Sequence, residues 1–454
     1  MQEQLEVYLA DTQTPQPVGT LGYRHPWGKG AYQFNYHPFW IDARPNMRLS
    51  GDLENTTVAQ HAMNNIFCCF KDCLPGVFGR GLIEKREQML AAEEGRKYYR
   101  LNEFCYFPFV DDEARAGAFR FRLPGQRTFV GEHKDNETYL PLPALGDYRR
   151  LLEIYETKPE ELTMDSIDTL IRYGAVMGGK RPKAVVIDPN NNVRYIAKLP
   201  SAQDEYDVPL WEYMCYQVAY SAGINLAFER LIDMKEFERS HVLLSRRFDR
   251  DDKQRRIHYM TAATLLNVPE DASAETGYGY MHMVRAIAGN KTMADPKRDI
   301  REIYRRIAFS ICIGNHNENF GNYAFLLTPK GWRLAPAYGF HPSHETSMRL
   351  LVTEKSNEAS IENLLKAATV YHIGPQEAAR IIEEVRMSVG RWRYSAVRCK
   401  IKSKEQARFA ERFDKYGIVP TPPKEEETPP NPTEEKGDSP QPSQRGGSVE
   451  RIEL

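Results

Sequence analysis

The sequence predicts an α+β protein that is rich in β-strands in its first part and mostly helical towards its end. Strand-like alternation recurs up to residue 123, strand-like and helix-like segments succeed one another from residue 183, and helical composition dominates towards residue 418. The following residues, rich in Pro, Glu, Ser and Gly, cannot bury enough apolar surface to fold. We therefore expect four parts: a β-rich subdomain over residues 1–125, a mixed sheet-and-helix part over 126–255, a helical part over 256–418 and a disordered tail over 419–454.

The amino-terminal part contains both strand and helix patterns. Apolar and polar residues alternate over residues 5–9, 32–36 and 116–123, and each of these segments is a predicted strand. Residues 15–19 contain Pro and Gly, and we expect them to break the first strand-like region. Residues 59–72 and 82–94 have helical composition and are predicted helices.

The rest of the chain alternates hairpins with helices. A helix is predicted over residues 163–173, with Asp165 in its acidic first turn. Two strand pairs are expected, one at 183–187 and 194–199 and the other at 323–327 and 332–334. The other predicted elements are a strand at 242–248 and helices at 208–222, 300–313, 375–389 and 404–415.

Composition and cysteine usage predict a cytoplasmic protein. A net charge of -1 argues against a surface devoted to a polyanion, so no direct nucleic-acid binding is expected. No apolar run approaches the ~20 residues that a membrane-spanning helix needs, and no secretory signal pattern begins the sequence. The seven cysteines have neither framework nor zinc-site spacing, and the cluster of Cys68, Cys69 and Cys73 is expected to be buried.

Three features follow one another in the order that protein kinases show, and the first two are weak alone. Gly178-Gly179-Lys180-Arg181 precedes a predicted strand, and consecutive glycines let backbone N–H groups close on phosphate oxygens. Lys198 ends the segment YIAK, which parallels the strand lysine that pairs nucleotide phosphates in kinases. However, paired glycines commonly form a simple turn, and a lysine at a strand end is commonly solvated.

The third and most specific feature is the segment IGNHNENFGNYAFLL at residues 313–327. Kinase catalytic loops carry an Asp that orients the attacking hydroxyl and, five residues later, an Asn that holds Mg²⁺. Asn317 and Asn322 have this spacing, and a predicted hairpin follows them. A second metal-binding Asp belongs after the hairpin, but there the segment LAPAYG ends in Gly339.

Together with further motifs, these features make the chain similar to the HipA family of serine/threonine kinase toxins from bacterial toxin–antitoxin systems. The resemblance covers most of residues 3–415 and implies a bilobal, protein-kinase-like fold. Its motifs, in family order, are GRGLIEKRE at 79–87, GAFRFR at 117–122, GGKRPKAVV at 178–186, YIAKLP at 195–200, LLSRRFDR at 243–250, RIHYMTAATLL at 256–266, the loop at 315–322, GWRLAPAY at 331–338 and a helix anchored by Trp392.

The resemblance implies an ATP site with Mg²⁺. By this resemblance the phosphate loop contains Gly178, Gly179, Lys180 and Arg181, and Lys198 contacts the α- and β-phosphates with Glu212 as its helix partner. The resemblance also places Arg246, Arg247 and Phe248 in the adenine-binding hinge, and gives Asn322 the role of the Mg²⁺-binding Asn.

Three positions depart from the family pattern. Asn317 stands where the family has its catalytic Asp, Asn319 where it has His, and Gly339 where it has the second metal-binding Asp. Losing a positioned base typically costs about 10²–10⁴ in rate, because an amide does not accept a proton as a carboxylate does. Mg²⁺ prefers carboxylate oxygens, so ATP and water alone would hold it here, which weakens the expected metal site.

Neighbouring residues offer no obvious replacement for the lost acids. Glu318 is the nearest carboxylate, but adjacent residues tend to point in different directions, and His341 and Glu345 are expected to be ordinary loop residues. The family also phosphorylates a serine in its own phosphate loop. No hydroxyl side chain occurs between residues 174 and 186, so this autophosphorylation is not expected.

Two functional readings stay open. In the first, a HipA-like protein keeps part of its ATP pocket, transfers phosphate weakly or not at all, as in a pseudokinase, and acts by binding. In the second, an active serine/threonine kinase toxin relies on Lys198 and Asn322 to phosphorylate a cytosolic protein. Nucleotidyl transfer has no specific support. Because the family's antitoxin is often a DNA-binding dimer, the resemblance implies a small helix-turn-helix antitoxin as partner, with DNA contact made through it.

Overall fold

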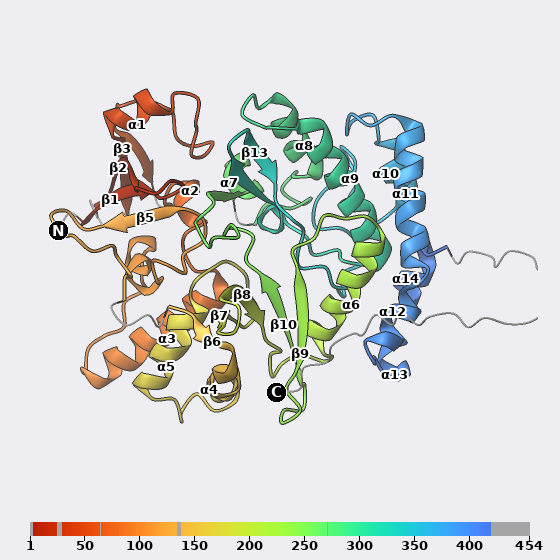
Figure 1. Ribbon diagram of the computed structural model, residues 1–454, viewed down its shortest axis with the longest axis horizontal. Helices are drawn as coiled ribbons and strands as arrows, with labels where there is room; N and C mark the ends of the chain where they lie inside the picture. Colours follow the sequence, from red (N-terminus) through yellow and green to blue (C-terminus); the bar gives the residue numbers. More distant parts are fainter. Residues whose placement is uncertain (1–2, 25–29, 64, 134–137, 270, 419–454) are drawn as a thin grey trace, which may run out of the picture. The chain divides into compact units, whose positions relative to one another are not determined.

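Three β-sheets and the helices around them make up the described part of the chain in the computed structural model (Figure 1). The structure describes residues 3–24, 30–63, 65–133, 138–269 and 271–418. These residues fall within one compact unit, and the predicted boundaries at 125 and 255 stay predictions. The tail predicted at 419–454 lies outside the described residues.

The first sheet is antiparallel and has the strand order β4-β3-β2-β1-β5. Its strands are β1 (Glu3–Leu9), β2 (Gln16–Arg24), β3 (Ala31–Tyr36), β4 (Gln60–Met63) and β5 (Phe119–Arg122). The predicted break at residues 15–19 is wrong, because β2 begins at Gln16. Pro17 is accommodated at a register shift opposite Tyr8, where the strand pairing tolerates its missing N–H.

The predicted helix over residues 59–72 is also wrong. Residues Gln60–Met63 pair with β3 as an edge strand, and only Cys68–Lys71 form a short helix, α2. The partner strand therefore overrides the local helical composition. The three clustered cysteines are buried free thiols, as predicted.

The remaining elements of the amino-terminal part lead towards the second sheet. They are α1 (Pro38–Ala43), α3 (Val77–Glu93) and the 3₁₀ helix η2 (Glu103–Phe109). The predicted helix over residues 82–94 corresponds to α3, which begins earlier, and α3 packs on α5 (Met164–Gly174).

The second sheet has the order β6-β7-β8-β10-β9 and carries the predicted nucleotide-binding segments. Its strands are β6 (Leu140–Pro141), β7 (Lys183–Asp188), β8 (Val193–Lys198), β9 (Glu229–Asp233) and β10 (His241–Arg246), and its helices are α4 (Leu145–Thr157), α5 and α6 (Val208–Ser221), with η3 (Leu142–Ala144) before α4. Helix α5 packs on β7, and α6 packs on β9 and β10. The predicted strand pair and helices of this region are confirmed.

Helix α6 begins where the sequence supplies a cap and a proline. The Asp207 side chain accepts a hydrogen bond from the Leu210 backbone N–H, 3.2 Å away, and Pro209 occupies a first-turn position where its missing N–H has no helical partner. This fixed start sets the position of every side chain that α6 presents to the sheet.

The third sheet, β11-β12-β13, joins the helical part of the chain. Its strands are β11 (Tyr259–Thr261), β12 (Ala324–Thr328) and β13 (Gly331–Leu334), and η4 (Phe320–Asn322) precedes β12. The helices are α7 (Ala262–Leu266), α8 (Tyr280–Gly289), α9 (Pro296–Ile313), α10 (Ile361–Lys366), α11 (Pro375–Val389), α12 (Trp392–Arg398), α13 (Ser403–Gln406) and α14 (Ala410–Tyr416). The helix predicted over 404–415 is therefore two short helices, and residues 335–360 contain no helix.

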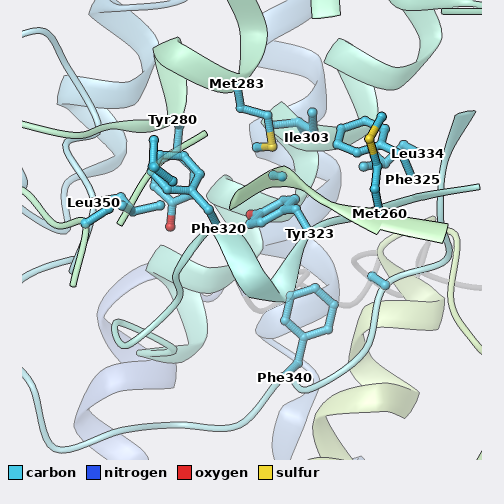
Figure 2. Close-up of a cluster of buried hydrophobic side chains, with 14 of the residues drawn as sticks. Met260, Tyr280, Met283, Ile303, Phe320, Tyr323, Phe325, Leu334, Phe340 and Leu350 are labelled. Carbon is cyan, nitrogen blue, oxygen red and sulfur yellow. The ribbon is translucent and has the colours of Figure 1, made fainter. Parts of the chain in front are cut away.

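A cluster of buried apolar side chains anchors the second half of the asparagine-rich segment, residues 320–327 (Figure 2). Phe320 and Tyr323 belong to the segment itself, and they lie beside Tyr280 of α8 in this cluster. Met260, Phe325 and Leu334 of the third sheet complete the same core. The polar loop is therefore held in place by apolar packing on its carboxyl-terminal side.

In the described part of the chain, no helix combines the length and apolar character needed to cross a membrane.

Candidate functional site

The asparagine-rich loop begins at the glycine that ends α9. Gly314 has the left-handed φ of 75°, and its N–H bonds to the carbonyl of Ser310. Because glycine adopts this conformation without steric cost, the helix stops here and the chain turns into the loop. The next residues therefore project from a fixed end of α9.

Two of the predicted site residues shape the loop itself. The Asn319 side-chain oxygen accepts a hydrogen bond from the Gly321 N–H at 2.8 Å, and the Asn322 side-chain oxygen accepts one from the Asn319 N–H at 3.2 Å. Together these bonds cap the short helix η4. Asn317 is exposed and stands apart from this capping pair. The side-chain oxygens of Asn319 and Asn322 therefore already accept hydrogen bonds from backbone N–H groups of the loop.

The structure brings position 339 next to Asn322. A Cβ built on Gly339 would lie 3.8 Å from the Asn322 side-chain nitrogen, so a side chain at this position would face the amide. The two predicted metal positions are therefore neighbours in space, although Gly339 has no side chain and a φ of 81°. Among the described residues, no group of three or more His, Cys, Asp or Glu side chains is arranged to hold a metal ion. These residues do not fit a protein-held Mg²⁺.

Glu318 does not replace the missing acids. Its side chain is buried, and its Oε2 accepts hydrogen bonds from the hydroxyls of Tyr280 and Tyr323, both at 3.1 Å. Burial raises the pKa of Glu318 to about 7. The carboxyl is therefore a member of the apolar core beneath the loop, and the prediction that it would not take over the site agrees with its position.

The predicted pair of Lys198 and Glu212 forms at the end of β8. The Lys198 Nζ contacts Glu212 Oε1 directly, and Glu229 Oε1 of β9 lies 3.8 Å away. Burial alone would lower the pKa of Lys198, but the two carboxylates outweigh it and raise that pKa. Lys198 is therefore protonated at neutral pH and positioned by Glu212, as is required of a lysine that binds phosphate.

The glycine loop rests on the start of α3. The Gly76 N–H bonds to the Met177 carbonyl at 3.1 Å, and the Phe78 N–H bonds to the Gly179 carbonyl at 3.2 Å. A Cβ on Gly76 would meet the Gly179 nitrogen at 2.3 Å, so this approach requires glycine. Residues 178–180 are exposed. The loop therefore offers its outer face to a ligand while α3 supports its inner face.

The two basic residues of the glycine loop have different roles. Arg181 is ion-paired with Asp204, its Nη1 lying 2.9 Å from Oδ1, so its charge is already balanced. Lys180 is exposed and stays available. A cavity of about 720 Å³ beside the loop is lined by both residues but not by Lys198, so only one end of the predicted phosphate site opens into it.

Lys183 is a residue that the sequence analysis did not single out. It is buried at the start of β7, and its Nζ donates to the Arg181 carbonyl at 2.6 Å. A Cβ on Gly179 would lie 3.2 Å from this Nζ, which places the ammonium directly under the glycine loop. Burial, with Lys198 and Arg181 nearby, lowers its pKa to about 7. A lysine inside the apolar run KAVVI was the signal that could have identified it.

The predicted adenine hinge is only partly available to a ligand. Arg247 is buried, and its guanidinium bonds to both carboxylate oxygens of Asp249 at 2.9 and 2.7 Å. Arg246 is 39% exposed and pairs with Asp252, whereas the Phe248 ring stacks on Tyr338 at 5.5 Å. A side-chain contact from Arg247 to a base is therefore not compatible with this arrangement, and a hinge role stays a prediction for Phe248 and the backbone.

Glu345 and His341, the two residues expected to be ordinary loop positions, have different surroundings. Glu345 contributes its backbone carbonyl, which accepts from His316 at 2.7 Å and from Arg412 at 2.8 Å. His341 donates from Nδ1 to the Pro342 carbonyl at 3.1 Å. Its pKa is lowered by burial, and the Glu212 carboxylate opposes this shift. His341 therefore faces the same charged cluster as Lys198.

The comparison with protein families covers the part of the chain that holds this site. Residues 175–392 match the family described as the HipA-like C-terminal domain. The chain contains a HipA-like C-terminal domain. The matched residues include the glycine loop, the Lys198 and Glu212 pair, the asparagine loop and Gly339. No curated protein matches the sequence.

Two solved structures are similar to this chain. HipA of Shewanella oneidensis MR-1, from a complex of the toxin–antitoxin system's HipA and HipB with operator DNA, aligns with a TM-score of 0.63 and 15% identity over 91% of this chain and 95% of that chain. The Helicobacter pylori proinflammatory kinase CtkA aligns with a TM-score of 0.39 and 14% identity over 53% of this chain and 90% of that chain. At such identity the likeness to HipA concerns the fold, and the predicted HipA-like α+β fold is confirmed.

Proposed function

We propose that this HipA-like protein binds ATP through a partly retained kinase-type pocket and transfers phosphate weakly or not at all. The observation that carries the proposal is the proximity of Gly339 to Asn322. A side chain at position 339 would point towards Asn322, 3.8 Å from its amide, but the position has no side chain. We therefore expect the nucleotide-binding half of the site to bind ATP and the metal-binding half to hold Mg²⁺ poorly.

Nucleotide binding is supported by the cations at the glycine loop. Lys198 is oriented by Glu212, Lys183 lies under Gly179, and Lys180 is exposed on the same loop. Charge-assisted hydrogen bonds from ammonium groups and backbone N–H groups are the usual means of holding phosphate. Bound ATP would supply the phosphoryl group, and these residues would bind and orient its phosphates.

Weak transfer is supported by the absence of a carboxylate at the reacting end. Asn317 cannot take the proton of an attacking hydroxyl, and Asn319 spends its side-chain oxygen on the Gly321 N–H. Glu318 is buried among tyrosines and stays away from this end. Without a positioned base, the rate is expected to be lower by about 10²–10⁴, and the weakened metal site lowers it further.

The test is transfer of the γ-phosphate from labelled ATP in the presence of Mg²⁺. The chain as it stands is compared with a variant carrying Asn317→Asp and Gly339→Asp, and with Lys198→Met as a control for contaminating kinases. We expect the signal of the unaltered chain not to exceed that of Lys198→Met. Robust transfer by the unaltered chain, abolished by Lys198→Met, would instead favour the alternative function, an active serine/threonine kinase toxin that phosphorylates a cytosolic protein.

A small DNA-binding antitoxin is the proposed partner, and toxin–antitoxin assembly is the proposed setting. The support is the likeness to a HipA that was solved with HipB and operator DNA. The near-neutral charge of this chain agrees with DNA contact through the partner. Expression with and without a neighbouring helix-turn-helix protein, scored by growth and by co-purification, tests both parts. Growth arrest by the unaltered chain alone would contradict a weakly active protein.

A further inference from the structure

A second carboxylate, that of Glu229, lies beside the predicted phosphate-binding lysine, and it belongs to none of the kinase-type motifs of the sequence. Glu229 Oε1 is 3.8 Å from Lys198 Nζ, and the Glu229 side chain is only 3% exposed. This same oxygen has no hydrogen-bond partner among the described residues. An unsatisfied buried carboxylate oxygen is costly, so its persistence next to a functional lysine calls for a role.

The position of Glu229 is fixed by the second sheet. In the antiparallel pairing of β9 and β10, Glu229 stands opposite Ser245, while β8, which carries Lys198, flanks the other edge of β10. The Ser245 side chain stabilises the ionised form of the Glu229 carboxyl and so opposes the rise in its pKa. Lys198 therefore lies between two carboxylates, with Glu212 in direct contact and Glu229 slightly farther away.

We propose that Glu229 is an internal competitor of the nucleotide for Lys198. When its carboxyl is ionised, Glu229 and Glu212 together neutralise the lysine and oppose the approach of phosphate. When the carboxyl is protonated, Lys198 keeps one counter-ion and has a surplus of positive charge to offer. The inference rests on the proposed function, since it concerns the affinity of that same site for nucleotide.

The protonation of Glu229 changes in an accessible pH range. Burial, opposed by Lys198 and aided by Glu212, raises the pKa of Glu229 to about 8. Nucleotide phosphates would add negative charge beside it, so binding and protonation of Glu229 are expected to favour each other. A pKa change of one unit on binding corresponds to about a tenfold change in affinity between the two protonation states.

Other charged groups face the same place and must be separated from Glu229. Lys183 on β7 loses its charge over a similar range, whereas Arg181 is paired with Asp204 and Glu212 contacts Lys198. On α6, the Tyr216 hydroxyl interacts with the backbone at Glu229, and burial raises the pKa of this tyrosine. On the loop after Gly339, His341 faces Glu212. Comparing two proteins at each pH cancels these contributions and that of the nucleotide itself.

The experiment measures binding of trinitrophenyl-ATP, without metal, to the full chain and to Glu229→Gln. At about pH 6.5 the two should bind alike, and at about pH 9 Glu229→Gln should bind about three- to tenfold more tightly. Equal affinities at both pH values would overturn the inference alone. Weaker binding by Glu229→Gln at both would also overturn it, because Glu229 would then position Lys198. Absence of binding by every protein at every pH would overturn the proposed function, and the inference with it.

A second variant keeps the test decisive if Glu229→Gln does not fold. Ser245→Ala removes a polar side chain that favours the ionised carboxyl of Glu229, so the pH at which affinity declines should move upwards. An unchanged midpoint in a folded Ser245→Ala protein would contradict the inference. Thermal unfolding of each variant establishes that the protein is folded before binding is measured.

Discussion

Two adjacent arginines at the end of β10 have opposite environments, and this difference is testable. Arg247 is buried against Asp249, whereas Arg246 is partly exposed and pairs with an Asp252 side chain that is 97% exposed. Arg247→Ala should lower the free energy of unfolding by about 3 kcal/mol, because it removes a partner from a buried carboxylate. Arg246→Ala should change it by less than about 1 kcal/mol. Urea unfolding of the two variants measures both values, and equal losses would contradict the buried network.

Glu318 gives a pH-dependent prediction at the same scale. Its pKa is raised to about 7 by burial, so its stabilising contribution is complete below its ordinary pKa and is lost as the pH rises through 7. Glu318→Gln keeps an acceptor for Tyr280 and Tyr323 but does not titrate. The midpoint of thermal unfolding of the unaltered chain should therefore fall, relative to that of Glu318→Gln, between about pH 5 and about pH 8.

That comparison has a clear contrary outcome. If the two midpoints changed in parallel over this range, Glu318 would be ionised throughout. A carboxylate that is ionised at pH 5 would then be open to solvent or paired with a cation, and it could be reconsidered as a substitute for the missing acids near Asn322.

The family resemblance anticipated one contact of the site, because Lys198 and Glu212 form the predicted pair. The nucleotide-binding role of this pair and the loop roles of Asn317 and Asn322 stay predictions. The capping role of Asn319 was not anticipated, because it depends on a short 3₁₀ turn that the local pattern does not specify. The role of Arg247 was also missed, since its partners Ala114 and Arg115 are far away in the sequence.

At the scale of elements, α6 is supported from behind by the last helices. The ring centroid of Trp211, the neighbour of Glu212, lies 4.9 Å from that of Phe409 and 6.4 Å from that of Trp392. The Trp392 ring in turn stacks on Phe413, with their centroids 4.8 Å apart. These aromatic contacts fix the rotation of α6 and therefore the direction of Glu212. The carboxyl-terminal helices thus contribute to the nucleotide site without touching it.

Removing the Trp392 ring should weaken both the fold and the site. Trp392→Ala is expected to lower the free energy of unfolding by about 3–5 kcal/mol, and to reduce nucleotide affinity because α6 loses its support. The matched control on the same helix is Tyr394→Ala, whose side chain is 67% exposed and whose loss should cost no more than about 0.5 kcal/mol. Unfolding and nucleotide titration of the pair decide the point, and unchanged affinity in a folded Trp392→Ala would contradict it.

Helices and strands with a strong local hydrophobic pattern were predictable from the sequence. An edge strand that forms only because it pairs with a distant strand was not. The strands at 183–187 and 194–199 and the helix at 375–389 correspond closely to β7, β8 and α11. The segment 59–72 failed because its first half pairs with β3 as an edge strand, a contact that local composition does not encode. The prediction of one helix over 404–415 was wrong, because the chain there forms two helices, α13 and α14. Phe409 lies between them and packs on Trp211.

At the scale of the whole molecule, the chain combines a supported nucleotide loop with a reacting end that lacks acids. Helix α3 of the amino-terminal part holds the glycine loop, α6 holds Glu212 against Lys198, and α9 with the third sheet holds the asparagine loop. Family motifs in the sequence anticipated this arrangement. The positions that lack the acidic side chains of the family were also readable in the sequence, whereas only the sheet brings Glu229 and Lys183 close to Lys198.

The central claim is that the pocket keeps its nucleotide site and has lost its metal site. Calorimetric titration of ATP with and without Mg²⁺ tests this claim most directly, with Lys198→Met as the control. We predict binding of ATP in both conditions with similar affinity, and at least about tenfold weaker binding by Lys198→Met, because a charge-assisted contact is lost. Binding that requires Mg²⁺ and is accompanied by consumption of ATP would contradict the account.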